Sequence, residues 1–385
     1  MSLRFFQSVI MLCLAAYAVA AQTAGEGHGP EILRAGYERA QAYERAGDWP
    51  AAERAWRQVV AAAPTDARAW TNLGVALNRQ DKTREALEAW RRAVQLDPKI
   101  SGAHFNLGLA HVRAGQSAEA LAPLRRALTL EPENEGVRRA LAVALVGVER
   151  FPEASRELAQ LLARVPRDAG LLELAAQTFI RQRRFQEAAT VLRRRLDLED
   201  GGTGHLWAMY GDALDGAHRT TEAAQAYERA VALAPESNAT RYGLGYLYWK
   251  LYRYDEAERV LTEVLKREPK DARAAFTLGD LYLTRGDAAR ALPLLELGAQ
   301  RYPEEFDTRY ALGRALQQTG DAARAVEELR AAIKLNDSIA DGHYQLGRLL
   351  LQLGRNEEGK RALARARTLH DSKRAVEAER SKLKP

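Results

Sequence analysis

Prolines recur at a fixed interval of 34 residues along this 385-residue chain, and this spacing limits the possible folds more than any other feature. The series comprises Pro64, Pro98, Pro132, Pro166, Pro235, Pro269 and Pro303. Asp200, Asp337 and Asp371 continue the register where proline is absent, with one extra residue after Asp200. A period of this length indicates an array of stacked repeats, because a single compact core stops growing at roughly 250 to 300 residues. Ten repeats fit between Leu33 and about Leu369.

Two columns of small residues follow the same period. The first column consists of Ala40, Gly74, Gly108, Ala142, Ala176, Gly211, Gly245, Gly279, Gly313 and Gly347. The second consists of Ala52, Ala86, Ala120, Ala154, Ala188, Ala223, Ala257, Ala291, Ala325 and Gly359. Turn-forming pairs such as Gly47-Asp48 lie between the columns, and apolar residues recur at helical spacing on both sides. We therefore predict an all-α stack of hairpins, each made of two antiparallel helices that approach closely at the small residues.

The repeats resemble those of the tetratricopeptide repeat family. Repeat two has residues typical of this family at Trp70, Leu73, Gly74, Ala86, Trp90, Ala93 and Pro98. The resemblance implies a right-handed α-solenoid of about ten helix-turn-helix repeats, in which the first helices line a concave groove that binds extended or helical peptides. Repeat five departs most from the pattern, with Ala175, Ala176, Arg195 and Asp200 where the family commonly has Leu, Gly, Ala and Pro. We therefore expect less regular stacking in the middle of the array.

The same irregularity suggests how the array is divided. Residues 33–202 contain repeats one to five, and residues 203–371 contain repeats six to ten. Gly201 and Gly202 raise the freedom of the backbone between them, so we expect a weak joint there. Residues 372–385 continue in helical spacing, and we interpret them as a helix that caps repeat ten. A disordered basic tail is the alternative for these residues.

Residues 1–21 have the pattern of a secretory signal peptide. Arg4 precedes an apolar stretch over residues 9–18, and small residues close the segment. Residues 22–32 then form a predicted polar linker. We expect export to the periplasm or to the outside of the cell, with no stable membrane span after the signal is cleaved. Retention of the segment as a membrane anchor is the alternative.

The sequence contains no motif that predicts catalysis. Glycine-rich nucleotide-binding loops and the HExxH zinc motif are absent, and Cys13 is the only cysteine, which excludes a zinc site built from cysteines. His104 and His111 lie on one helical face and could be metal ligands, but both occupy columns that the family uses for packing. The net charge of +6 is spread along the chain. Arginines such as Arg91 and Arg92 could bind a phosphate-rich partner, but acidic residues accompany them, and we expect a solvated outer face. We expect no enzyme activity, no cofactor, no metal and no nucleic-acid partner.

An aromatic column in the last repeats is the strongest candidate for a partner-binding surface. Its members are Tyr242, Phe276, Tyr310 and Tyr344, each 34 residues from the next. The residues four positions later lie on the same helical face, and they are Tyr246, Asp280, Arg314 and Arg348. Trp249 adds a further large ring. Aromatic side chains beside arginines are enriched among interface hot spots. Tyrosine at this position could instead pack only against the adjacent repeat.

These features favour a non-catalytic scaffold or adaptor that binds a protein or peptide in the groove. Asn72 and Asn106 resemble the asparagine ladder of the O-linked N-acetylglucosamine transferases, although the catalytic part of those enzymes has no counterpart in this sequence. The alternative is a structural subunit of an envelope assembly, such as secretion, pilus or polysaccharide-export machinery. A permanent subunit should purify in a fixed-ratio complex, whereas an adaptor should be recovered mainly alone. The identity of the partner and the oligomeric state stay open at this point.

Overall fold

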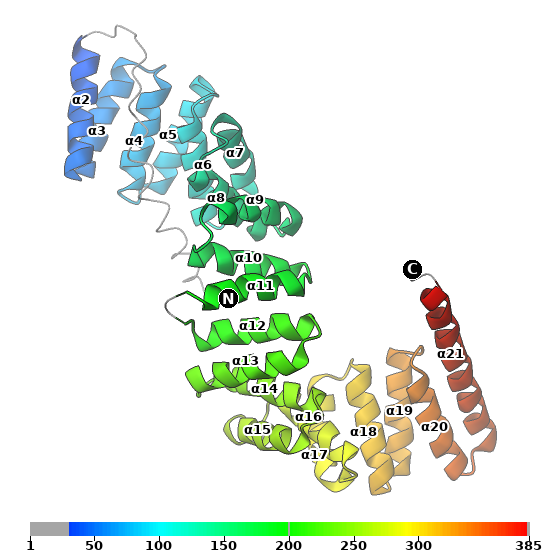
Figure 1. Ribbon diagram of the computed structural model, residues 1–385. Coiled ribbons are helices and arrows are strands. Elements are labelled where there is room, and N and C mark those ends of the chain that lie inside the picture. Colours follow the sequence, from blue (N-terminus) through cyan, green and yellow to red (C-terminus); the bar gives the residue numbers. More distant parts are fainter. Residues whose placement is uncertain (1–30, 199–200, 383–385) are drawn as a thin grey trace. The chain divides into compact units, whose positions relative to one another are not determined.

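A computed structural model describes residues 31–198 and 201–382 of the chain. All the regular elements in these residues are α-helices, twenty in number, and none of these residues forms a strand. The chain divides into two compact units between Gly201 and Gly202 (Figure 1). The predicted signal peptide and most of the predicted linker lie outside the described residues. The all-α array of hairpins predicted from the 34-residue period is confirmed.

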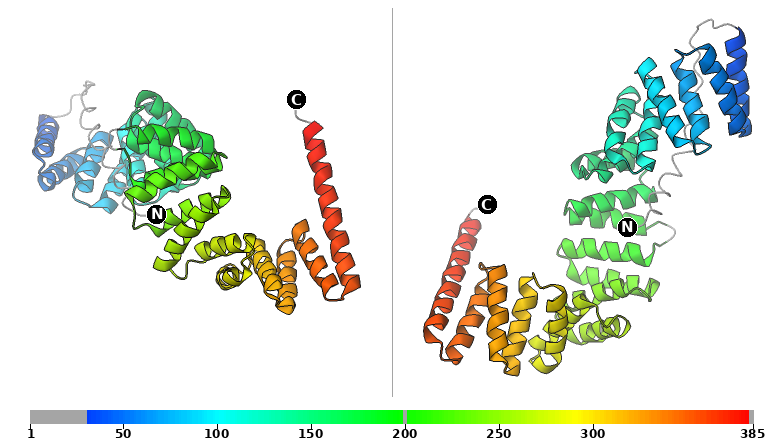
Figure 2. Two further views of the ribbon diagram at one scale, coloured as in Figure 1. Left: turned by 60° about the horizontal axis from the view of Figure 1, so that its bottom comes forward. Right: turned by 180° about the vertical axis from the view of Figure 1, so that it is seen from behind.

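Each unit consists of five helical hairpins, and Figure 2 shows them from two further sides. The helices of the first unit are α2 Glu31–Ala46 and α3 Trp49–Ala62, α4 Ala67–Asn78 and α5 Thr83–Leu96, α6 Ser101–Arg113 and α7 Ser117–Leu130, α8 Glu135–Gly147 and α9 Phe151–Arg164, and α10 Ala169–Arg181 and α11 Phe185–Leu196. Those of the second unit are α12 Gly204–Gly216 and α13 Thr220–Leu233, α14 Asn238–Lys250 and α15 Tyr254–Arg267, α16 Ala272–Thr284 and α17 Ala288–Arg301, α18 Phe306–Thr319 and α19 Ala322–Leu335, and α20 Ala340–Gln352 and α21 Asn356–Lys382.

Close helix contact inside a hairpin depends on the small residues of the two columns. At Gly74 on α4, an added Cβ atom would lie 2.3 Å from Nε1 of Trp90 on α5. Trp90 is only 2% exposed, and its indole N–H donates to the carbonyl oxygen of Thr71 over 3.0 Å. Ala86 on α5 is fully buried. The indole therefore fills the space that the glycine leaves open, and the same pairing holds the two helices together.

Every hairpin turn contains one residue with a positive φ angle. Glycine occupies this position in five turns, at Gly47, Gly115, Gly286, Gly320 and Gly354. The other five turns have Asp81, Glu149, Arg183, His218 and Tyr252, with φ between 58° and 62°. The left-handed backbone is thus a requirement of the hairpin, and it is met even where the residue has a Cβ atom.

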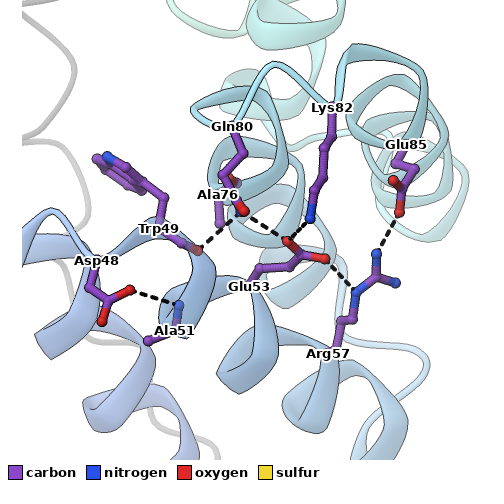
Figure 3. A network of polar contacts seen from close by, with 9 residues as sticks. All are labelled: Asp48, Trp49, Ala51, Glu53, Arg57, Ala76, Gln80, Lys82 and Glu85. Carbon is purple, nitrogen blue, oxygen red and sulfur yellow. Dashed lines mark hydrogen bonds and ion pairs between the residues drawn. The ribbon is translucent and has the colours of Figure 1, made fainter.

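Polar contacts join neighbouring hairpins, and Figure 3 shows one such network around Glu53 on α3. Its carboxylate accepts hydrogen bonds from Lys82 Nζ at 2.6 Å, from Gln80 Nε2 at 2.9 Å and from Arg57 Nε at 2.9 Å. Arg57 also pairs with Glu85 on α5 at 2.5 Å. Burial by itself raises the pKa of Glu53, but the three hydrogen bonds outweigh burial and hold this pKa below its ordinary value. The carboxylate of Glu53 therefore connects the first and second hairpins, and its hydrogen bonds keep it charged despite its burial.

Repeat five forms a regular hairpin despite its unusual sequence. Ala176, in the small column, and Ala175, where the family commonly has leucine, are both buried on α10, at 0% and 1% exposed. Arg195 on α11 donates from Nε to Glu173 on α10 over 2.7 Å, so an ion pair stands where the family commonly has alanine. The backbone therefore departs from the repeat only after α11, where Gly201 and Gly202 both have positive φ.

The last helix of the second unit continues beyond the tenth hairpin. Residues 372–382 prolong α21 without a break, and residues 371–379 are all exposed. Val376, for example, is 50% exposed. A capping role for this segment stays a prediction. Among the described residues, no helix has both the length and the apolar character needed to cross a membrane.

Candidate partner-binding surface

Successive first helices of the second unit contact one another. Contacts join α12 to α14, α14 to α16, α16 to α18 and α18 to α20, whereas successive second helices lie farther apart (Figure 1). The first helices therefore line the inner side of this stack. The predicted column lies on these helices, and we call its nine residues the inner strip: Tyr242, Tyr246, Trp249, Phe276, Asp280, Tyr310, Arg314, Tyr344 and Arg348. All nine are half-buried or exposed.

The aromatic residues of α14 form a stacked row. The ring of Tyr242 lies 6.3 Å from that of Tyr246, with 29° between their planes. The ring of Tyr246 lies 5.6 Å from that of Trp249, with 25° between their planes. Ser237 accepts a hydrogen bond from the backbone N–H of Thr240 and so caps the start of this helix. The spacing of three and four residues along α14 places the three rings on one face.

Trp249 also connects this row to the next repeat. Its indole N–H donates to Oδ2 of Asp280 on α16 over 3.1 Å. Burial raises the pKa of Asp280, although the hydrogen bond from Trp249 and the nearby guanidinium of Arg314 both oppose this effect. The inner strip thus contains a partly desolvated carboxylate between an indole and an arginine.

The arginines of the strip lie on tyrosine rings. The guanidinium carbon of Arg314 is 5.7 Å from the ring centroid of Tyr310 on α18, and that of Arg348 is 5.7 Å from the ring centroid of Tyr344 on α20. Neither arginine forms an ion pair with any residue that the structure describes. By contrast, Arg309 on α18 pairs with Glu328 at 2.8 Å. Neither guanidinium of the inner strip is thus engaged in an ion pair, although Arg314 lies close enough to Asp280 to interact with it electrostatically.

Some residues of the strip also contribute to packing between helices. Phe276 lies against α17, where an added Cβ atom on Gly298 would be 3.2 Å from the Cβ atom of Phe276. Burial raises the pKa of Tyr310, while Arg314 and a side-chain hydrogen bond with Gln345 on α20 lower it. Phe276 thus packs within its own hairpin, whereas Tyr310 interacts with the next repeat through Gln345. Tyr344 is 47% exposed and is the member with the most accessible ring.

Three further contacts belong to this surface although sequence reasoning did not include them. Arg273 on α16 places its guanidinium 4.8 Å from the ring centroid of Tyr242. Lys250 lies 5.8 Å from the ring centroid of Tyr246 and bridges to Asp215 on α12 at 2.6 Å. Phe306 stacks on Tyr310 at 5.5 Å with 16° between the planes. The i+4 relation to strip residues would have indicated Lys250 and Phe306, because it places them on the same helical face.

The stacked rings on and beside the inner strip form two clusters rather than one continuous row. The first contains Tyr242, Tyr246 and Trp249, and the second contains Phe306 and Tyr310. No ring contact joins them within the described part of the chain. Asp280 on α16 and Arg314 on α18 interact electrostatically. The surface therefore combines stacked rings with an interacting carboxylate and guanidinium.

The histidines considered as metal ligands have separate partners. A ring nitrogen of His104 lies 3.1 Å from the carbonyl oxygen of Pro98, and Nδ1 of His111 lies 2.8 Å from Oε1 of Gln116. His111 is 7% exposed. Residues 31–198 and 201–382 contain no group of three or more His, Cys, Asp or Glu side chains that could hold a metal ion.

Two protein-family models match the repeats of this chain. A family model described as tetratricopeptide repeat matches residues 37–83, 79–135, 208–258, 242–306 and 310–373, and a second model of the same description matches residues 111–178. No curated protein matches the chain. Among solved structures, MamA from Desulfovibrio magneticus RS-1 is 20% identical with a TM-score of 0.41, and the match covers 44% of this chain and 96% of that chain. A MamA MSR-1 structure is 24% identical with a TM-score of 0.40, covering 44% of this chain and 98% of that chain.

Proposed function

The chain belongs to the tetratricopeptide repeat family and is therefore a protein–protein interaction scaffold, and on this premise we propose that it binds a peptide or protein segment along the inner strip of its second unit. The main support for this proposal is the environment of the guanidinium groups of Arg314 and Arg348. Each guanidinium is held over a tyrosine ring and has no ion pair among the described residues. Such a cation is oriented in advance for a carboxylate of a partner.

The aromatic residues supply the area that such a partner would cover. Rings that are already stacked lose little side-chain freedom on binding, so they contribute area at low entropic cost. Tyr242, Tyr246 and Trp249 form such a row, and Trp249 is fixed further by Asp280. We infer that the partner places apolar side chains on α14 and α16 and acidic groups near α18 and α20.

We propose that the chain acts on this partner by binding alone. Repeats of this family are generally non-catalytic, and the sequence contains no nucleotide-binding or zinc motif. The partner should therefore keep its covalent mass after incubation with the purified chain. A change in that mass that requires the chain would contradict this part of the proposal.

We also propose that the protein works outside the cytoplasm. The support is the sequence of residues 1–21, with its charged start, apolar stretch and small residues at the end. Mass spectrometry of material from the native cell should show a chain that lacks about 20 residues at its start, the length typical of a cleaved signal peptide. An intact Met1 in a cytosolic fraction would contradict export.

Photo-crosslinking from the inner strip tests the binding site. A photoreactive side chain at Tyr344 should crosslink a partner in the native cell, because this ring is 47% exposed on the strip. The matched control is the same side chain at Lys334, which is exposed on the second helix α19 of the preceding hairpin. The partner trapped at Tyr344 is then purified, and its affinity is measured with native and variant chains. Equal crosslinking from both positions, or from Lys334 alone, would remove the inner strip from consideration.

A further inference from the structure

The first helices of the last two repeats have the same three kinds of side chain in the same order. The residues are Asp307, Tyr310 and Arg314 on α18, and Asp341, Tyr344 and Arg348 on α20. Steps of three and then four residues place each set on one face of its helix. We call Asp307 and Asp341 the acidic edge of the inner strip, and Arg314 and Arg348 its basic edge.

Helices α18 and α20 lie side by side and run in the same direction. At their starts, a ring carbon of Phe306 on α18 would lie 3.2 Å from a Cβ atom added at Gly342 on α20. At their ends, Nε2 of Gln317 on α18 donates to Oε1 of Gln352 on α20 over 3.3 Å. Equivalent residues of the two helices are therefore neighbours. The acidic edge, the tyrosines and the basic edge form three parallel lines that cross both helices.

The four charges of the two edges are available to a partner. Their side chains are exposed or half-buried, and none of them forms an ion pair with any residue that the structure describes. Arg314 is attracted by Asp280, which Asp307 also approaches closely enough to repel. Asp341 interacts electrostatically with Tyr310. These interactions with strip residues place Asp307 and Asp341 on the same inner surface as the two arginines.

The preceding first helix, α16, has the opposite order of charges, with Arg273 before Asp280. Both of these residues have partners within the chain. Arg273 pairs with Asp271 at 3.6 Å, and Asp280 accepts the hydrogen bond from Trp249. The helix dipole favours an acid in the first turn, but Arg273 at that place shows that the dipole does not require one. The two edges are therefore a feature of α18 and α20.

The dimensions of the three lines suit an α-helix. Seven residues separate the acidic edge from the basic edge on each helix, which is about 10.5 Å and close to the diameter of a helix with its side chains. Packed helices lie about 8 to 10 Å apart, so side chains seven residues apart on a partner helix would meet α18 and α20 in turn. An extended strand directs alternate side chains to opposite faces and offers a surface one line of side chains, not three.

We propose that the partner segment is an α-helix with an apolar stripe that lies on the tyrosines, an acidic side and a basic side. The proposal rests on the function proposed above and adds the form, the charge order and the direction of the bound segment. The acidic side faces Arg314 and Arg348, and the basic side faces Asp307 and Asp341. Turning the helix end for end would bring like charges together at both edges, so the segment binds in one direction only.

Selection from two peptide libraries on the immobilised full chain tests the form of the segment. Both libraries contain peptides of about 20 residues, because shorter isolated helices are marginal in water. Apolar residues recur at every third or fourth position in the first library and at every second position in the other, with Glu, Lys and Gln varied elsewhere. We expect enrichment from the first library, of peptides with acids on one side of the stripe and bases on the other. A chain with Tyr344→Ala should retain these peptides poorly.

Exchanging the two edges tests the direction. Arg314→Asp/Arg348→Asp and Asp307→Arg/Asp341→Arg should each lower the affinity for an enriched peptide at least about tenfold. The chain with all four changes has exchanged edges and the native net charge, and it should recover most of the lost affinity with the peptide reversed. A photoreactive group at the N-terminus of the peptide detects the reversal, because its crosslink moves to the opposite end of the site. Lys334→Glu on the second helix α19 is the control and should bind like the native chain.

The outcomes separate this proposal from binding at the inner strip as such. Peptides that need Tyr344 but come from the second library, or that mix both charges on each side, would overturn the charged helix and leave the inner strip as a binding surface. An exchanged chain that keeps its fold by circular dichroism but binds weakly, or binds the peptide in the native direction, would also overturn it. So would a selection that enriches no peptide, and crosslinking from Tyr344 then decides separately whether the inner strip binds a partner.

Discussion

The indole N–H of Trp249 donates to Oδ2 of Asp280 over 3.1 Å, so a side chain of α14 is joined to a side chain of α16. The bond connects two repeats at the inner strip. It also satisfies a carboxylate whose surroundings disfavour its charge, since burial raises the pKa of Asp280. An arginine on a third helix, Arg314, lies close enough to interact with the same carboxylate. The charge of the Asp280 carboxylate therefore affects both the contact between two repeats and the surface that a partner would meet.

Replacing Asp280 with asparagine should stabilise the fold at neutral pH. An aspartate with a raised pKa in the folded chain binds protons more readily than in the unfolded chain. Its ionised carboxylate therefore lowers the free energy of unfolding at pH values above the folded pKa. This loss disappears as the pH falls below the unfolded pKa of about 4. The side-chain amide of the variant would keep an oxygen for Trp249 without the charge. We expect Asp280→Asn to melt at a higher temperature than the native chain at pH 7, with the difference shrinking towards pH 4.

The matched variant for this test removes the donor instead. Trp249→Phe leaves the carboxylate of Asp280 without its hydrogen bond and should lower the free energy of unfolding by about 1 to 3 kcal/mol. Melting curves of the three chains at several pH values provide the measurement. Our account of Asp280 is wrong if Asp280→Asn is less stable than the native chain at pH 7.

Replacing residues of the inner strip should weaken partner binding. We expect Tyr310→Ala and Arg314→Ala each to reduce affinity for the crosslinked partner by about 1 to 2 kcal/mol or more, the range of interface hot spots. Titration calorimetry measures the loss, and circular dichroism checks that the fold persists. Lys334→Ala on the outer helix α19 is the control and should bind like the native chain. Unchanged affinity in both strip variants would argue against this surface.

Hydrogen exchange should be faster at the joint between the two units than at other inter-repeat turns. Gly201 and Gly202 have φ angles of 61° and 80°, and the boundary of the two compact units falls between them. In a solenoid the stability is nearly a sum over neighbours, so a weak interface separates two cooperative units. We expect the fastest exchange from Gly201 to Thr203 and at Asp200, which lies outside the described residues. Uniform protection across all inter-repeat turns would contradict a weak joint.

The close contact at Gly74 should not tolerate a methyl group. Gly74→Ala places a Cβ atom 2.3 Å from Nε1 of Trp90, so the indole must move and overpacking should lower stability by about 1 to 3 kcal/mol. Repeats one, four and five have alanine in this column. Ala142 and Ala176 stand opposite Leu158 and Leu192, whereas Ala40 stands opposite Trp56, whose indole N–H donates to Glu44 and not to a backbone carbonyl oxygen as that of Trp90 does.

The double variant Gly74→Ala/Trp90→Leu recreates the pairing of repeats four and five. It should therefore lose less stability than the sum of its two single changes. Denaturant unfolding of the four chains measures the coupling energy. Strict additivity would show that the glycine and the indole do not constrain each other.

Glu53 should contribute stability that disappears in acid. Its pKa is lowered in the folded chain, so its contribution is present above the unfolded value of about 4.3 and is lost as the pH falls through the folded pKa. We expect Glu53→Gln to cost about 1 to 2 kcal/mol at pH 7 and to resemble the native chain in acid. Glu85→Gln is the control, because Glu85 also pairs with Arg57 but its side chain is 49% exposed. This substitution should lower the free energy of unfolding by less than about 1 kcal/mol. Equal losses from the two variants at pH 7 would contradict a special role for the buried carboxylate.

The hairpins could be predicted because their contacts lie within one repeat. Helices α3 and α5 end at Ala62 and Leu96, two residues before Pro64 and Pro98. The cause is local, since the residue before a proline avoids the helical conformation. The helical spacing of Tyr242 and Tyr246 likewise predicted that their rings share one face, and they are stacked. Where the partner of a residue is within a helix or its hairpin, the spacing along the chain is sufficient.

Contacts between helices and the exposure of single side chains required the tertiary structure. Arg309 and Arg314 are both on α18, yet only Arg309 forms an ion pair, with Glu328 on α19, because the two side chains leave the helix in different directions. Tyr248 and Tyr252 are four residues apart, but the first is 6% exposed and the second is 78% exposed. Helix α14 ends at Lys250, so the rule that places residues four apart on one face no longer applies at Tyr252. The period of the sequence determined the hairpins, and the packing of one helix on another decided which of their side chains stay free for a partner.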